Sequence, residues 1–271
     1  TQRNRARLEA DGVAFVGPED GEMACGEFGP GRMAEPERIF EAIESMLVPE
    51  RPLAARKALV TAGPTRELLD PVRYLSNHSS GRQGYAIAQA LAEAGAETVL
   101  VSGPVAFAPP LRTKLVKVET ACEMLAACER ALPVDIVVCA AAVADWRPEI
   151  HSERKLKKND SDAAPPPIRL VRNPDILATL AKADRRPALV IGFAAETENV
   201  LASAKAKRIR KGCDWILAND VSAETGIIGG EQNRVHLITA SGDEDWPRMD
   251  KKEVARRLAA RIAEALASAA K

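Results

Sequence analysis

The stretch that decides the predicted fold is "KALVTAGPTRELLDPVRYLSNHSSGRQGYAIAQALAEAGA", which runs from Lys57 to Ala96. It opens with an apolar run that ends at Gly63 and closes with an amphipathic pattern that ends at Gly95. A short apolar run bounded by glycine is typical of a strand buried on both faces, and the amphipathic pattern is typical of a helix packed on that strand. The main part of the chain therefore begins with a strand, a long loop and a helix.

The same alternation continues towards the C-terminus. We predict further strands in "ETVLVSGP", "LVKVET", "DIVVCAAAV", "ALVIGFAAET" and "DWILAND", with an edge strand in "RVHLITASG". We predict helices in "ACEMLAACERAL", "NVLASAKAKRIRKG" and "KKEVARRLAARIAEALASA". Strands that alternate with helices indicate the α/β class, here a doubly wound, mostly parallel, Rossmann-like sheet.

Two segments depart from this alternation. The segment 48–56 is rich in proline and charge, so we predict a linker between a short tail, 1–47, and the main domain, 57–271. The segment 147–172 holds four prolines and many charges without a core-building period. A loop of this length inside a compact domain is usually functional or disordered, so we predict a flexible lid there.

The composition excludes several classes of function. Lysine plus arginine equals aspartate plus glutamate at 38 each. The net charge is therefore zero, and the composition shows no excess of positive charge that would indicate nucleic-acid binding. No apolar run is long enough to predict a membrane-spanning helix, and "TQRNRARLEADG" has no apolar signal core. The five cysteines have no metal-ligand spacing, which favours reduced thiols in the cytoplasm.

The long loop after Gly63 ends in small polar residues, Ser79, Ser80 and Gly81. In doubly wound sheets ligands bind outside the carboxyl ends of the strands, where a helix N-terminus offers free N–H groups. Gly81 and Gly84 would let a phosphate approach the backbone closely. A serine N-cap with glycines in a turn explains the same residues equally well. Neither a G-x-G-x-x-G nor a Walker A pattern is present.

Other clusters point to the same edge of the sheet. The small residues Ala140 to Ala142 lead to Asp145 and would let a planar base or ribose pack on the backbone, although simple strand packing explains them too. The cluster "RKLKK", 154–158, could bind phosphates, as could Lys207 and Lys211, which share one helical face. Solvated charge is the commoner explanation of such clusters. Together they favour a nucleoside triphosphate as the ligand.

Two further motifs have adequate structural explanations. "NPDI", from Asn173 to Ile176, is typical of a helix start, and Phe193 in "IGFAAET" fits a core position. The histidines are scattered along the chain, and no catalytic triad can be recognised from them.

The motifs "TAGPTRE", "DPVRYLSNHSSGRQGYAIA", "AAAVADW", "KLKK", "NPDI", "GFAAET", "AKRIRKG" and "ANDVS" occur in this order over roughly Lys57 to Ala267. In order and spacing they resemble the phosphopantothenoylcysteine synthetase family, the ligases of coenzyme A biosynthesis. The resemblance implies an acyl-cytidylate made from 4'-phosphopantothenate and CTP, which the amine of L-cysteine then attacks. It also implies bound Mg²⁺, a homodimer, and a larger oligomer in the full-length fusion protein.

The resemblance also implies roles for individual residues. It makes Asn77 and Lys155 catalytic, with Lys155 on a mobile flap and Asp145 near nucleotide or metal. The implied nucleotide-binding residues are Gly63, Ser79, Ser80, Gly81, Ala140, Ala141, Ala142, Asp145, Lys155, Asn173, Pro174, Asp175, Ile176, Phe193, Lys207 and Lys211. The chain departs from the family in the loop "TGIIGGEQNRV", 225–235, where many members carry an aromatic residue and an aspartate.

The tail adds a second resemblance. "GEMACGEFGPGRMAEPERI" is similar to the C-terminal segment of the phosphopantothenoylcysteine decarboxylases, FMN-dependent lyases often fused ahead of the synthetase. This resemblance implies that Cys25 matches a proton donor, but the flavin-binding domain is missing, so we expect no decarboxylase activity and a disordered or swapped tail. Two alternatives to the ligase are a non-catalytic nucleotide-binding subunit of the same fold and a nicotinamide-dependent oxidoreductase.

Overall fold

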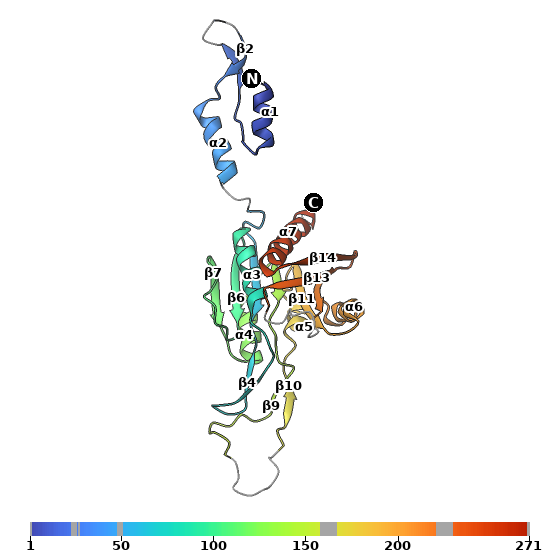
Figure 1. Ribbon diagram of the computed structural model, residues 1–271. Helices are drawn as coiled ribbons and strands as arrows, with labels where there is room; N and C mark the ends of the chain where they lie inside the picture. Colours follow the sequence, from blue (N-terminus) through green and yellow to red (C-terminus); the bar gives the residue numbers. More distant parts are fainter. Residues whose placement is uncertain are drawn as a thin grey trace. The chain divides into compact units, whose positions relative to one another are not determined.

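The structure is a computed structural model that describes residues 2–22, 26, 28–47, 51–157, 167–220 and 230–269. It divides into two compact units, Thr1–Glu50 and Arg51–Lys271. The larger unit is built on an eight-stranded sheet in the order β14-β13-β12-β11-β8-β3-β6-β7 (Figure 1). Its strands are β3 (Lys57–Ala62), β6 (Glu97–Ser102), β7 (Thr113–Lys117), β8 (Ile136–Cys139), β11 (Leu189–Glu196), β12 (Trp215–Asp220), β13 (Gln232–Ile238) and β14 (Asp243–Asp250).

Helices cover both faces of this sheet. Alternate residues of each strand point to opposite faces, so Val60 packs with helices α3 (Arg82–Glu93) and α7 (Lys251–Ala269), while Leu59 packs with α4 (Ala121–Ala131). Helices α5 (Ile176–Ala181) and α6 (Val200–Lys211) lie on the same face as α4. The six strands from β7 to β12 in the sheet order are parallel, which confirms the predicted doubly wound α/β fold.

Two predictions about the strands were wrong. "RVHLITASG" is not an edge strand, because β13 pairs antiparallel with β12 on one side and with β14 on the other. Strand β14 was missed because Pro247 and several charges hide a strand pattern; an edge strand tolerates proline, since it lacks a hydrogen-bonding neighbour on one side. Strand β8 ends at Cys139, so Ala140 to Ala142 belong to the following loop.

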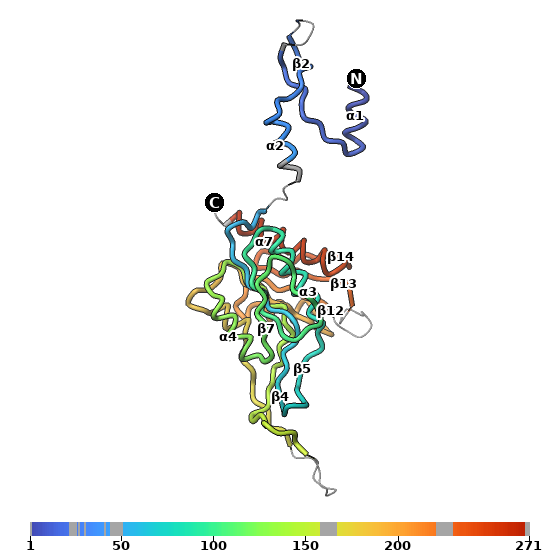
Figure 2. The backbone as a smooth tube through the Cα atoms, turned by 90° about the vertical axis from the view of Figure 1, so that its left-hand side faces the viewer, coloured from blue at the N-terminus to red at the C-terminus, as the bar shows by residue number. Residues whose placement is uncertain are grey.

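Two small ribbons extend beyond the carboxyl edge of the sheet (Figures 1 and 2). One is the hairpin of β4 (Arg66–Leu68) and β5 (Tyr74–Ser76). The other joins β9 (Trp146–Pro148) to β10 (Leu170–Arg172), the two ends of the predicted lid. The ends of 147–172 are therefore antiparallel strands rather than irregular loop, with Pro148 at the end of β9, while Lys158, Pro165 and Pro166 lie outside the described residues.

The N-terminal unit is small. It contains α1 (Gln2–Ala10), α2 (Pro36–Leu47) and an antiparallel pair, β1 (Glu19–Glu22) and β2 (Phe28–Arg32), instead of the disorder expected of the tail. Ala34 is almost fully buried in it, and Cys25 lies outside the described residues. Of the predicted linker, Leu53 is fully buried in the larger unit, so the folded part begins before Lys57.

Candidate functional site

The chain reverses direction across the sheet between β3 and β8. From β3 it proceeds outward to β6 and β7, and then returns to β8 on the opposite side of β3. The carboxyl ends of β3 and β8 meet there: Ala142 N donates to Gly63 O at 2.9 Å, and Thr65 N donates to Ala142 O at 3.3 Å. Such a switch point leaves a crevice outside the strand ends, which is where doubly wound proteins bind ligands.

The start of α3 lies against this switch point. Gly81 is the N-cap residue, with φ 76°, and a Cβ there would lie 2.7 Å from Val105. The alternative of a serine N-cap is therefore wrong, because this crowded left-handed position needs glycine. Ser79 Oγ instead accepts a hydrogen bond from Gly81 N. Gly84 serves helix packing rather than phosphate approach, since its Cβ would meet that of Ala62 at 2.5 Å.

A cavity of about 490 Å³ opens off the ends of β8 and β11. Nine of the predicted site residues line it: Ala141, Asp145, Asn173, Pro174, Asp175, Ile176, Phe193, Lys207 and Lys211. The lining residues missed by sequence analysis are Thr61, Cys139, Val143, Ala144, Trp146, Arg172 and Leu177. Trp146 and Arg172 face each other in the β9–β10 ribbon, with the guanidinium 5.8 Å from the ring centre. In the sequence, the only indication of a role for Trp146 and Arg172 is that they directly adjoin the predicted site residues Asp145 and Asn173.

Lys211 and Asp175 form an ion pair on one wall of the cavity. Asp175 also caps α5 by accepting from Ala178 N at 3.1 Å, as the "NPDI" pattern predicted. Burial opposes ionisation of this carboxyl, but the hydrogen bonds from Lys211 and Ala178 N outweigh it and lower the pKa. The charge of Lys211 is thus already balanced within the protein.

Lys207 differs from Lys211, although both project from the same face of α6. It is half-buried, and the described residues give its ammonium group no hydrogen bond and no ion pair. Burial lowers its pKa, against smaller opposing effects of the Glu196 and Asp145 carboxylates. A desolvated cation without a close counterion is costly, and a bound anion would offset that cost.

Asp145 and Asn173 lie at the entrance of the β9–β10 ribbon. The Asn173 amide donates to Ala144 O at 2.8 Å and accepts from Arg147 at 3.3 Å, so its side chain holds the ribbon in place. The Asp145 carboxylate is exposed to the cavity and makes no hydrogen bond within the described ranges. No group of three metal-ligating side chains occurs among the described residues. One free carboxylate beside a phosphate site still fits Mg²⁺, which commonly takes one or two carboxylates and completes its shell with phosphates and water.

The remaining predicted residues lie outside the cavity lining. They are Gly63, Asn77, Ser79, Ser80, Gly81, Ala140, Ala142 and Lys155. Asn77 is close to it, because its amide nitrogen donates to the carbonyl of Val143, a lining residue, at 2.9 Å. Lys155 is farther along the chain, beside the β4–β5 hairpin, to which the backbone of Leu156 is hydrogen-bonded. Of the variant loop 225–235, residues 225–229 lie outside the described part.

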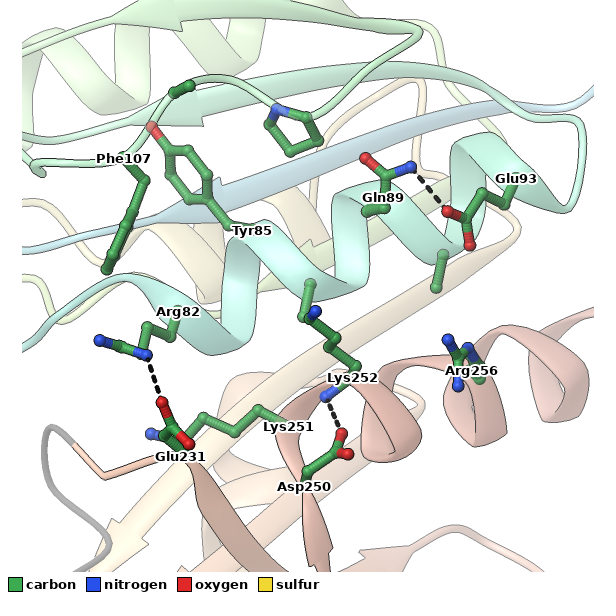
Figure 3. A pocket seen from close by; sticks show the side chains of 14 residues that line it. Arg82, Tyr85, Gln89, Glu93, Phe107, Glu231, Asp250, Lys251, Lys252 and Arg256 are labelled. Carbon is green, nitrogen blue, oxygen red and sulfur yellow. Dashed lines mark hydrogen bonds and ion pairs between the residues drawn. The ribbon is translucent and has the colours of Figure 1, made fainter.

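A larger cavity, about 720 Å³, lies elsewhere, between α3, the start of α7 and the 107–110 loop (Figure 3). Arg82 pairs there with Glu231 at 3.4 Å, and Lys251 Nζ donates to Gly230 O at 2.6 Å. Asp250 caps the first turn of α7 by accepting from Lys252 N and Glu253 N, each at 2.8 Å. Most of the charged groups that line this larger cavity already have ion-pair or hydrogen-bond partners within the protein. Its size alone therefore does not make it the functional site.

A comparison with models of known protein families shows which family this chain belongs to. Residues 53–266 match the family "DNA/pantothenate metabolism flavoprotein C-terminal domain". The chain belongs to this family. Two curated members are called coenzyme A biosynthesis bifunctional protein CoaBC. The one from Escherichia coli strain K12 is 45% identical over 256 residues, and the one from Vibrio vulnificus strain CMCP6 is 43% identical over 248.

The matches cover 94% and 91% of this chain but only 63% and 61% of these two relatives, so the chain spans less than two thirds of their length. Among solved structures, the C-terminal domain of a CoaBC protein is 40% identical, with a TM-score of 0.68, over 81% of this chain and 100% of that one. These findings confirm the predicted family and the Rossmann-like fold. None of the described helices is long and apolar enough to cross a lipid bilayer.

Proposed function

We propose that the larger unit is a phosphopantothenate–cysteine ligase that uses CTP. The observation that carries the proposal is the half-buried, unpaired ammonium group of Lys207 in a cavity at the switch point of the sheet. A triphosphate would supply the missing counterion. The likeness to the C-terminal domain of CoaBC, at 40% identity, supports the choice of reaction.

In the proposed reaction the carboxylate of 4'-phosphopantothenate attacks the α-phosphate of CTP, and pyrophosphate leaves. The amine of L-cysteine then attacks the acyl carbon of the acyl-cytidylate and releases CMP. Both steps need charge neutralisation and positioning more than a nucleophile on the protein.

We assign the following roles to residues of this chain. Lys207 neutralises phosphate charge, and the Lys211–Asp175 pair fixes the wall beside it. The loop after β8 packs against base or ribose through small residues such as Ala141. Asn77, at the rim, contacts the acyl-cytidylate, and Lys155 is delivered by the lid. Asp145 would hold Mg²⁺, which supplies further neutralisation of the phosphates.

Pyrophosphate release tests this proposal. Purified protein with CTP, 4'-phosphopantothenate, L-cysteine and Mg²⁺ should release pyrophosphate and CMP in equal amounts, and omission of 4'-phosphopantothenate should abolish both. Replacing CTP by ATP measures the nucleotide preference. Nucleotide binding without turnover would instead indicate the alternative, a non-catalytic subunit of the same fold.

The wider proposals concern the parent protein. The segment 1–47 is proposed as the end of an FMN-dependent decarboxylase half, with Cys25 as its proton donor. We also propose that the chain forms a homodimer, that the fusion protein forms a larger oligomer, and that the protein is cytoplasmic. Light scattering of the purified chain tests the dimer.

A further inference from the structure

Asp70 is a fully buried carboxylate at the tip of the β4–β5 hairpin. Its Oδ1 atom accepts from the backbone N–H groups of Val72 and Arg73, each at 2.8 Å. Its Oδ2 atom accepts from the Arg73 side chain, at 3.0 Å from Nε and 2.5 Å from Nη2. These four bonds close the turn that joins the two strands of the hairpin.

The same carboxylate also reaches into the lid. Oδ2 accepts from Leu156 N at 3.1 Å, and Arg73 Nη2 donates to Leu156 O at 2.8 Å. Both backbone polar groups of Leu156 are therefore held by the Asp70–Arg73 pair. A second tie lies nearby, since Ser152 N donates to Leu69 O at 3.1 Å. A carboxylate that only closed the turn would have no need of the bond to Leu156.

The two residues that the proposed function makes catalytic flank this anchor. Lys155 directly precedes Leu156, and β5 leads from Arg73 to Asn77 at the cavity rim. We infer that Asp70 is a positioning residue that sets Lys155 and Asn77 in one fixed relation to the cavity. This inference rests on the proposed function for the roles of those two residues, but the anchor itself is a property of the fold.

The anchor should control how often the start of the lid opens. Trypsin can cleave after Arg154, Lys155 and Lys157, and cleavage of a folded protein follows the population of its locally open form. A hydrogen bond to a charged group contributes enough stability that its loss should raise cleavage about 10- to 100-fold. The catalytic rate kcat should also fall, since Lys155 loses its fixed position, with an unchanged KM for CTP, because the cavity itself is intact.

Leu156→Pro is the sharpest variant, because proline removes the N–H group that Asp70 accepts from. Leu156→Ala is its matched control, since it keeps that N–H group and removes only a partly exposed side chain. Asp70→Asn removes the charge that holds Arg73 and Leu156 together. Each protein is compared with wild type for trypsin cleavage after Arg154 and after Lys157, because trypsin does not cleave after Lys155 when proline follows it. The same proteins are compared for kcat and KM, and for thermal midpoint.

The inference predicts fast cleavage and low kcat in Leu156→Pro and Asp70→Asn, and wild-type behaviour in Leu156→Ala. The two variants at Leu156 should keep similar thermal midpoints, whereas Asp70→Asn should have a lower one, because it breaks a buried ion pair. Equal cleavage in Leu156→Pro and Leu156→Ala would overturn it, and so would fast cleavage with wild-type kcat. If Asp70→Asn fails to fold, the comparison of Leu156→Pro with Leu156→Ala tests the inference without it. A wild-type protein that makes no pyrophosphate would refute the proposed function, whereas the cleavage comparison would still test the anchor.

Discussion

Two cavities of the larger unit differ in how their charged groups are paired, and within the described ranges the smaller of the two holds the unpaired charge. The cavity beside α7 measures about 720 Å³ and the cavity at the switch point about 490 Å³. In the larger one Arg82 and Lys251 already have partners within the protein. In the smaller one Lys207 is half-buried and has no ion pair among the described residues. A half-buried charge without an ion pair, and not volume, marks the place where a charged ligand stabilises the protein.

The largest expected effect belongs to Asn77→Ala, at the rim of the smaller cavity. Loss of one preorganised hydrogen bond at a reacting centre costs about 2.7–4 kcal/mol, or roughly 100- to 1000-fold in kcat. The matched control is Gln89→Ala in the larger cavity, where the amide donates a hydrogen bond to the Glu93 carboxylate. Steady-state pyrophosphate release measures both variants. A loss below threefold in Asn77→Ala would refute its catalytic role.

Lys207→Met should weaken catalysis with CTP less severely. A charge-assisted hydrogen bond contributes about 1.5–3 kcal/mol, so kcat/KM for CTP should fall about 10- to 150-fold. The same change should raise stability by about 1 kcal/mol, because it removes a desolvated, unpaired cation. Lys252→Met, on an exposed residue of the larger cavity, should leave kcat/KM unchanged. An equal loss of kcat/KM for CTP in Lys207→Met and Lys252→Met would contradict the assignment of CTP binding to the smaller cavity.

CTP binding should also depend on pH through Lys207. Burial places its pKa below the ordinary value of lysine, so its charge is lost at a lower pH than that of an exposed lysine. Affinity for CTP should therefore fall as the pH rises through the lowered pKa. Folding stability should change in the opposite direction, because the unfolded chain binds more protons in this window. Titration calorimetry of Lys207→Arg, whose guanidinium stays charged, should show a flat profile.

The smallest effect concerns thiol reactivity. Burial raises the pKa of Cys139, which lines the smaller cavity, whereas Cys122 is exposed on α4. Because the thiolate is the reactive form, iodoacetamide at pH 8 should modify Cys122 well before Cys139. Peptide mass spectrometry follows both sites in one sample. Equal rates would mean that water reaches the base of the cavity more freely than the packing around Cys139 implies.

Local patterns were enough to predict most of the fold. The apolar runs of the parallel strands, the spacing of α6 with its C-cap at Gly212, and the N-cap Asp175 all follow from short-range rules. The same rules placed Lys207 and Lys211 on one face. They failed at β14, where pairing with β13 outweighs the local propensity of Pro247.

The candidate site was predictable only as a set of residues, not as an arrangement. Sequence spacing cannot show that Lys211 is paired with Asp175 while Lys207 is not, because the partners lie on different helices. Nor can it show that Asp70 reaches Leu156, since 86 residues separate them. Such long-range contacts are set by the order of strands in the sheet. That order decides which carboxyl ends meet.

The outermost strand β14 has a consequence for the solubility of the isolated unit. An unpaired edge presents free N–H and C=O groups to which a strand of another molecule can add, and amyloid grows in this way. Here the carboxylates of Asp243, Glu244 and Asp245 are held in ion pairs within the protein, but Pro247 has no N–H group to donate at this edge. The missing donor at Pro247 opposes the stacking of copies through this strand. The sequence that hid β14 from prediction therefore also protects it from aggregation.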